Sequence, residues 1–148
     1  MPASSNDSSR RLFLLFPVAA GCLYLLARPG APRVPEIPIK EVMLEEAKAL
    51  IAAGALVVDV RNRAAYEARH IAGAISAPVE SLERRIPADL EQARALPIVV
   101  YCGDGMALGP EGTRVLNKAG FAGAVNLKPG LQGWAAAGLP IEQAVKPS

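Results

Sequence analysis

Cys102 is the residue whose surroundings most clearly predict chemistry. It follows an apolar run over 97–101 and precedes a loop that contains Gly103, Gly105 and Gly109. The nucleophilic form of cysteine is the thiolate. The backbone N–H groups of a curled glycine-rich loop, and the N-terminus of a helix that follows it, favour an anion at such a position. A cysteine that only packs in a core needs no such loop, so the pattern predicts a reactive residue.

The elements around Cys102 alternate between apolar runs of strand length and segments with helical spacing. Strands are predicted over 55–58, 74–76, 97–101 and 124–127, because short unbroken apolar runs are typical of strands buried on both faces. Helices are predicted around 44–51, over 62–70, over 79–96 with a break near Pro87, from a first turn that holds Pro110 to a stop at Gly120, and around Trp134. This alternation predicts an α/β domain with a mostly parallel sheet. Ligands bind such sheets at the carboxyl ends of the strands, where Cys102 lies.

Composition excludes several classes of site. The chain has 148 residues, of which 20% are charged and 51% hydrophobic, which is typical of a folded domain. The net charge is +2 and the basic residues are scattered, so no nucleic-acid partner is predicted. Cys22 and Cys102 are the two cysteines, and His70 is the single histidine. The sequence therefore predicts no disulfide framework, no metal site and no cofactor.

The N-terminal 27 residues have the pattern of a signal sequence or a membrane anchor. Arg10 and Arg11 precede an uncharged run over 12–27, which is slightly shorter than the about 20 residues of a spanning helix. The arginine pair resembles a twin-arginine export signal, or is the basic flank of any membrane segment, and Cys22 allows a weak lipoprotein site. An uncleaved anchor is preferred. Prolines over 28–38 predict an extended spacer. We expect a bacterial periplasmic or inner membrane-anchored location, with an anchored domain that faces the cytoplasm as the alternative.

Five short motifs occur in the order, and at nearly the spacing, of one known domain family. They are VVDVR at 57–61, YE at 66–67, HIAGA at 70–74, VVYC at 99–102 with Gly105, and NLKPGLQGW at 126–134. Over about 39–142 the chain resembles the rhodanese-like domain, which leaves 143–148 as a C-terminal tail. The resemblance implies a three-layer α/β fold, in which a five-stranded parallel sheet has helices on both faces.

The resemblance also implies an activity and a set of site residues. Cys102 would attack a sulfane sulfur, as in thiosulfate, and become a persulfide. The outer sulfur would then pass to a thiol or another thiophilic acceptor, including a protein. The substrate and anion-binding loop would comprise Gly103, Asp104, Gly105, Met106, Ala107 and Leu108. Asp59 and Arg61 would tie strand ends to loops, and His70 would be the family's structural histidine, bonded to the backbone.

The loop departs from the family pattern in its charge. The family often has an arginine five residues after the cysteine and another directly after it, whereas this chain has Ala107 and Gly103 there, and Asp104 adds a negative charge. A dianionic thiosulfate is therefore expected to bind less well. Arg114 and Lys118 could compensate from the following helix, or be solvated surface charges. A loop without arginine also argues against phosphatase chemistry, which relies on that cation.

Two further functions stay open from the sequence. A catalytically weak rhodanese-like module could act as a membrane-tethered sulfur carrier or as a protein-interaction domain. An exposed thiolate could also be a redox sensor that forms a sulfenic acid. The predicted domain has no second cysteine to resolve such an acid as a disulfide, so the sensor ranks below the other two.

Overall fold

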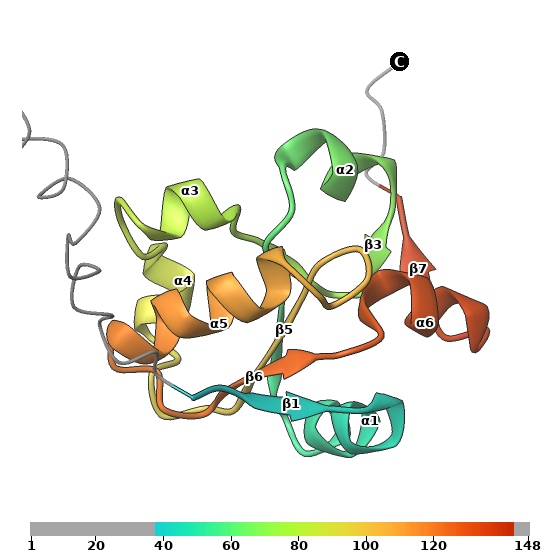
Figure 1. Ribbon diagram of the computed structural model, residues 1–148, viewed down its shortest axis with the longest axis horizontal. Helices are drawn as coiled ribbons and strands as arrows, with labels where there is room; N and C mark the ends of the chain where they lie inside the picture. Colours follow the sequence, from blue (N-terminus) through green and yellow to red (C-terminus); the bar gives the residue numbers. More distant parts are fainter. Residues whose placement is uncertain (1–37, 144–148) are drawn as a thin grey trace, which may run out of the picture. The chain divides into compact units, whose positions relative to one another are not determined.

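A parallel sheet forms the centre of the region that the structure, a computed structural model, describes, residues 38–143 (Figure 1). Its five strands lie in the order β1, β6, β5, β2, β4. Their bounds are β1 Lys40–Val42, β2 Leu56–Asp59, β4 Ile75–Ser76, β5 Ile98–Tyr101 and β6 Ala124–Leu127. The helices are α1 Leu44–Ala52, α2 Arg63–Ala68, α3 Val79–Leu82, α4 Ala88–Glu91, α5 Leu108–Lys118 and α6 Gly130–Ala136.

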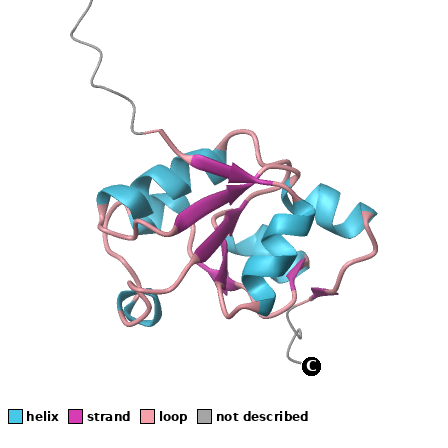
Figure 2. Ribbon diagram, turned by 90° about the horizontal axis from the view of Figure 1, so that it is seen from below, coloured by secondary structure: helices cyan, strands magenta, loops and turns pink. Residues whose placement is uncertain are grey.

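Helices cover both faces of this sheet (Figure 2). Successive residues of a strand point to opposite faces, so the unbroken valine runs of β2 and β5 supply two cores. Val57 and Val99 are neighbours in register and pack with residues of α1 and α6. Val58 and Val100 are neighbours as well, and pack with residues of α3, α4 and α5. The predicted α/β fold with a five-stranded parallel sheet is confirmed.

Two pairs of strands include strands that the sequence did not predict. β1 is an edge strand in which only Val42 is buried, and it pairs with β6. β3 (His70–Ile71) and β7 (Ile141–Glu142) form a separate antiparallel pair. Each of these strands has two or three residues, which is too short for an alternating apolar pattern to show.

Three predicted helical segments end or begin elsewhere than expected. The helix predicted over 62–70 was wrong at its end, because α2 stops at Ala68 and His70 belongs to β3. Asn62 is its N-cap, and its side chain accepts a bond of 2.8 Å from the N–H of Ala65. The segment over 79–96 contains two one-turn helices, α3 and α4, instead of one helix with a single break. The glycine-rich loop is shorter than predicted, because Leu108 already begins α5.

The predicted signal or anchor over 1–27 and nearly all of the spacer over 28–38 lie outside the described residues, as does most of the tail over 143–148. Within residues 38–143, no helix has both the length and the apolar character needed to cross a bilayer.

Candidate active site

Cys102 lies directly after β5, the middle strand of the parallel sheet. The neighbouring strands end at the same edge, where β2 contributes Asp59 and β6 contributes Asn126. The cysteine is only 3% exposed and packs in the core beneath α3, α4 and α5. The fold therefore places this thiol at the sheet edge where parallel α/β domains bind their ligands.

The loop after Cys102 curls around the sulfur atom. The backbone N–H of Gly105 donates to Sγ at 3.3 Å, and the thiol lies 3.6 Å from Oδ1 of Asp104, to which it can donate. The same carboxylate oxygen accepts a bond of 2.9 Å from the N–H of Met106. This backbone bond lowers the pKa of Asp104, because it stabilises the ionised form. One N–H donor and one negative charge thus lie against the same sulfur.

Gly105 is the residue that allows the loop to turn. Its φ is +77°, in the left-handed region that favours glycine. A Cβ at this position would overlap the carbonyl oxygen of Lys128, so the loop lies backbone against backbone on the segment after β6. The side-chain amide of Asn126 donates to the Gly105 carbonyl at 2.9 Å. A close approach and a buried hydrogen bond therefore hold the N–H of Gly105 toward Sγ.

Two helix N-termini surround this loop. In α6, the N–H groups of Leu131 and Gln132 donate to the carbonyls of Cys102 and Gly103, each at 2.9 Å. In α5, Gly109 lies in the first turn, and a Cβ there would be 3.4 Å from Sγ. α5 has eleven residues and points the positive end of its dipole at the sulfur. Sγ therefore lies against a loop N–H and the first turn of α5, while α6 holds the loop through the carbonyls of Cys102 and Gly103.

A cavity of about 330 Å³ opens in front of Cys102. Of the predicted loop residues, Gly103, Asp104, Ala107 and Leu108 line it. Gly105 is buried within the loop, whereas Met106 is exposed and does not line the cavity. Four of the six predicted loop residues therefore line the cavity, and Gly105 instead shapes the turn.

The cavity and its support include two residues that the sequence did not reveal as part of the site. Gln132 of α6 lines the cavity. Asn126 supports the loop from β6, and its Oδ1 is buried without a hydrogen-bond partner. A polar residue inside an otherwise apolar strand is a signal that could have revealed Asn126. Nothing in the local sequence marks Gln132.

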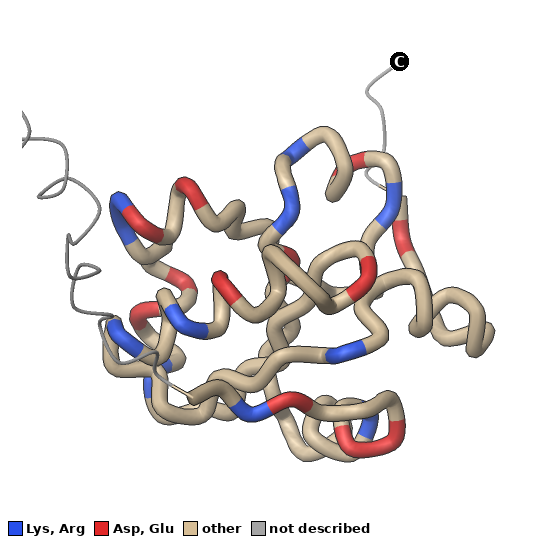
Figure 3. Tube along the Cα trace, in the orientation of Figure 1, with Lys and Arg blue, Asp and Glu red and all other residues tan. Residues whose placement is uncertain are grey.

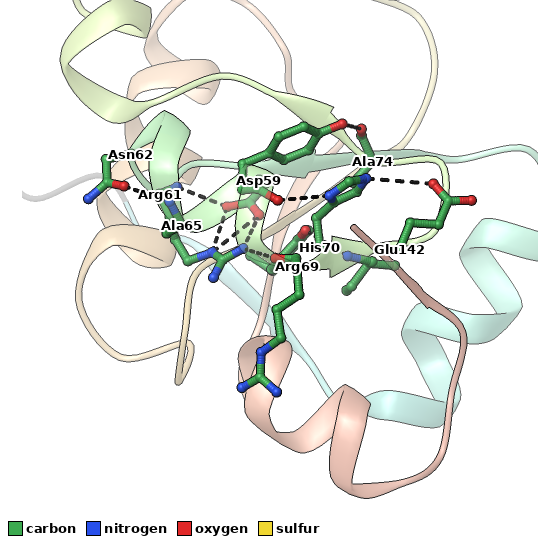
Figure 4. A network of polar contacts seen from close by, with 11 residues as sticks. Asp59, Arg61, Asn62, Ala65, Arg69, His70, Ala74 and Glu142 are labelled. Carbon is green, nitrogen blue, oxygen red and sulfur yellow. Dashed lines mark hydrogen bonds and ion pairs between the residues drawn. The ribbon is translucent and has the colours of Figure 1, made fainter. Parts of the chain in front are cut away.

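Asp59 and Arg61 form a buried ion pair at the end of β2 (Figure 4). Arg61 Nη2 lies 2.6 Å from Asp59 Oδ2, Nε also donates to the carboxylate, and Nη2 bonds the carbonyl of Arg69 at 2.7 Å. Burial disfavours charge on the guanidinium, but the bonds to Asp59 and its negative charge outweigh this, and the pKa of Arg61 is raised. Asp59 and Arg61 thus tie the end of β2 to the segment before β3, while Arg61 also lines the cavity.

His70 lies away from the cysteine. Its Nδ1 is 2.8 Å from the carbonyl oxygen of Tyr66, and its ring stacks on the Tyr66 ring with 3.9 Å between centroids. Nε2 lies 3.6 Å from Oε2 of Glu142 on β7 (Figure 4). The structure therefore surrounds His70 with backbone and packing contacts and does not pair it with Cys102.

Arg114 and Lys118, the two cations considered as substitutes for a loop arginine, do not line the cavity in front of Cys102. Arg114 pairs with Glu111 one turn away, at 3.1 Å. Lys118 borders a different groove, between α5 and the segment that follows α3. Neither of these two cations of α5 therefore takes the place of the missing loop arginine at the cavity.

The family model of the rhodanese-like domain matches residues 43–137, a span that contains β2, the cysteine loop and α6. The chain belongs to the rhodanese-like domain family. Among curated proteins, it is 38% identical over 87 residues to the uncharacterized protein YibN of Escherichia coli K12, which covers 59% of this chain. The matched region spans 60% of the length of YibN, so that protein has additional sequence outside the shared region.

Solved rhodanese-like structures resemble this chain over most of its length. The rhodanese-like domain of an Anabaena protein superimposes with a TM-score of 0.61 at 28% identity, over 75% of this chain and 86% of that one. The human single-domain sulfurtransferase TSTD1 gives a TM-score of 0.56 at 29% identity, over 67% of this chain and 97% of that one. This rhodanese-like domain therefore has a sulfurtransferase among its structural neighbours.

Proposed function

We propose that this rhodanese-like domain is a sulfurtransferase that works through a persulfide on Cys102. The observation that supports it is the position of Sγ, against the Gly105 N–H and the first turn of α5, in the wall of an open cavity. Both features stabilise negative charge on sulfur. The thiolate before the transfer and the persulfide anion after it both carry negative charge on sulfur, so both need this stabilisation.

The proposed reaction has two steps, and the electrons balance in each. The Cys102 thiolate attacks the sulfane sulfur of a donor, a new S–S bond forms, and the donor leaves with the electron pair of the broken bond as sulfite or a thiolate. A thiolate acceptor then attacks the outer sulfur of the persulfide, and Cys102 leaves as the thiolate. Neither step needs a metal or a redox cofactor.

Intact-mass spectrometry of residues 38–148 after incubation with a sulfane donor tests this proposal. We expect an adduct of about 32 Da, one sulfur atom, that is absent in Cys102→Ser and is removed by excess thiol. Donors should include thiosulfate and organic persulfides, since the cavity lacks the loop arginine. If none of these donors loads the wild type, the proposal is wrong.

A second function is favoured by two large apolar side chains that are exposed near Cys102: Leu108, which lines the cavity and is 42% exposed, and Met106, which lies on the loop after Cys102 and is 66% exposed. Exposed apolar groups beside a reactive thiol suit contact with a protein partner. The domain would then carry sulfur to that partner with little turnover on small molecules. A Cys102→Ser variant that keeps full biological function would favour an interaction role over either form of sulfur transfer.

We also propose that the uncharged run over 12–27 holds this domain at the inner membrane or directs its export. The run supports the proposal because it follows two arginines and is uncharged over 16 residues. Fractionation of cells that express the full chain tests it. The chain should appear with membranes or in the periplasm, and recovery entirely in the cytoplasm would contradict the proposal.

A further inference from the structure

The charges that face the Cys102 cavity add up to a negative value. Among the described residues, the charged side chains that line it are Arg61 and Asp104. Arg61 is committed to Asp59 through two nitrogen atoms, so this pair contributes no net charge. Asp104 is exposed, and its carboxylate accepts hydrogen bonds from the Met106 N–H and the Cys102 thiol. Its carboxylate therefore has no compensating cation in the part of the chain that the structure describes.

This uncompensated charge lies next to the reacting atom. Oδ1 of Asp104 is 3.6 Å from Sγ. In Figure 3 the loop between β5 and α5 is tan except for a red, acidic stretch, and it has no blue, basic one. The Met106 N–H fixes the direction of the carboxylate. A donor whose sulfane sulfur reaches Sγ must bring its own charges near this group. Two negative charges on thiosulfate would be repelled, whereas a positive charge on a donor would be attracted.

The remaining contacts around the sulfur are suited to an organic group. Leu108 and Ala107 line the cavity beside Asp104, and Met106 is exposed on the same loop. Gln132 supplies a neutral amide on the opposite helix. Such a lining can bury carbon atoms of a donor, but its one cation, Arg61, is already paired with Asp59, so it offers an inorganic dianion no unpaired cation to bind.

We propose that Asp104 is a specificity-determining residue, and that it makes the site selective for organic persulfides with a cationic group beside the sulfane sulfur, against thiosulfate. This inference rests on the proposed sulfurtransferase function and names its donor class. The Cys102 thiolate would attack the outer sulfur of the donor R–S–SH and form a new S–S bond. The S–S bond of the donor would break, R–S⁻ would leave with its electron pair, and Cys102 would hold the persulfide. An ammonium group on R would lie near the Asp104 carboxylate during this transfer.

The test compares two donors, thiosulfate and 2-aminoethyl persulfide, by the rate at which each loads Cys102 of the full chain, followed by the mass of the peptide that contains Cys102 and not Cys22. The quantity of interest is the ratio of the two rates, because any effect of Asp104 on the thiol itself is common to both donors. Asp104→Asn keeps the oxygen that accepts from Met106 and removes the charge. Glu80→Gln, an exposed carboxylate on α3 outside the cavity lining, changes the net charge equally and is the matched control.

In the wild type, 2-aminoethyl persulfide should load Cys102 faster than thiosulfate does. Asp104→Asn should shift the ratio toward thiosulfate about tenfold, since near a carboxylate in water a negative unit charge is disfavoured several-fold and a positive one is favoured by a similar factor. Glu80→Gln should leave the ratio unchanged. Added salt should narrow the wild-type ratio and affect Asp104→Asn less, because exposed charges are screened.

Three results would overturn the inference, and they are distinct. If both donors load the protein but Asp104→Asn leaves the ratio as it was, Asp104 does not select the donor and the sulfurtransferase function stands. If neither donor loads the wild type, the sulfurtransferase function fails and the inference fails with it. A ratio that shifts equally in Glu80→Gln would assign the effect to net charge and also overturn a role for Asp104.

Discussion

Gly105→Ala should damage the site more than a methyl group added at any other position of the loop. Gly105 has φ +77° and Gly73 has φ +74°, so alanine at either position meets the same backbone penalty of about 1 kcal/mol. A Cβ at Gly73 meets nothing within 4 Å, whereas a Cβ at Gly105 overlaps the carbonyl oxygen of Lys128. Gly73→Ala is therefore a matched control that isolates the close approach of the two backbones.

The additional cost at Gly105 comes from the movement that the overlap forces. The partner atom is backbone, so the loop must move away from the segment after β6. This movement breaks the bond from Asn126 and leaves its buried amide without an acceptor, which costs about 1–3 kcal/mol. Added to the backbone penalty, Gly105→Ala should lower the free energy of unfolding by about 3 kcal/mol, against about 1 kcal/mol for Gly73→Ala.

Urea denaturation followed by Trp134 fluorescence measures both values, since Trp134 is buried and is the single tryptophan. Intact-mass spectra of the folded variants then report persulfide formation, which should fall in Gly105→Ala as its N–H leaves Sγ. Equal losses of stability in the two variants would refute the reasoning, because they would show that the contact with Lys128 has no energetic consequence.

Three further predictions concern the support of the site. Asn126→Ala should lower the free energy of unfolding by about 2 kcal/mol, since the Gly105 carbonyl loses its buried donor; urea denaturation would show it, and an unchanged midpoint would count against it. Asp59→Ala should lower the free energy of unfolding by about 3 kcal/mol, because it leaves the Arg61 guanidinium, which is only 14% exposed, without its partner carboxylate. A second substitution, Arg61→Met, should recover most of this loss in the same assay. The pKa of Asp104 is lower in the folded protein than the ordinary value of about 3.9. The stability that comes from its bond to the Met106 N–H is therefore fully present above that ordinary pKa, and it is lost as the pH falls through the lowered pKa. The stability difference between wild type and Asp104→Asn should stay constant above about pH 5 and change only below it, and a change near neutral pH would contradict this.

The segment from β5 to α5 could be predicted because its signals are local. An apolar run, a cysteine, closely spaced glycines and Pro110 follow one another in the chain. Each has a meaning that does not depend on distant residues: a buried strand, a nucleophile, a tight turn and a helix start. For the same reason the order of the main strands and helices, and with it the fold class, could be predicted.

The rest of the site depends on partners that are distant in sequence. β1 has the sequence Lys-Glu-Val, and it becomes a strand because its backbone pairs with β6, more than eighty residues later. Gln132 reaches the cavity because the first turn of α6 bonds the carbonyls of Cys102 and Gly103. The glycine at 105 is required by the backbone of Lys128. Such requirements arise only when the chain is folded, so no local pattern contains them.

The charge of the site, too, could be predicted only in part from the sequence. The sequence alone reveals that Asp104 is present in the loop and that an arginine is not. It does not reveal that Arg61 also lines the cavity, or that Asp59 already neutralises it. The preference against thiosulfate expected from the loop sequence therefore becomes a specific inference about Asp104 only when the lining of the cavity is known.

A single-turnover transfer experiment tests the persulfide on Cys102 most directly. The protein is loaded with a sulfane donor, freed of excess donor and mixed with a thiol acceptor, and both partners are followed by mass spectrometry. We predict that an adduct of about 32 Da maps to Cys102, disappears on mixing, and appears on the acceptor in equal amount. An adduct that never forms on Cys102, or that stays there while the acceptor remains unmodified, would contradict the sulfurtransferase mechanism.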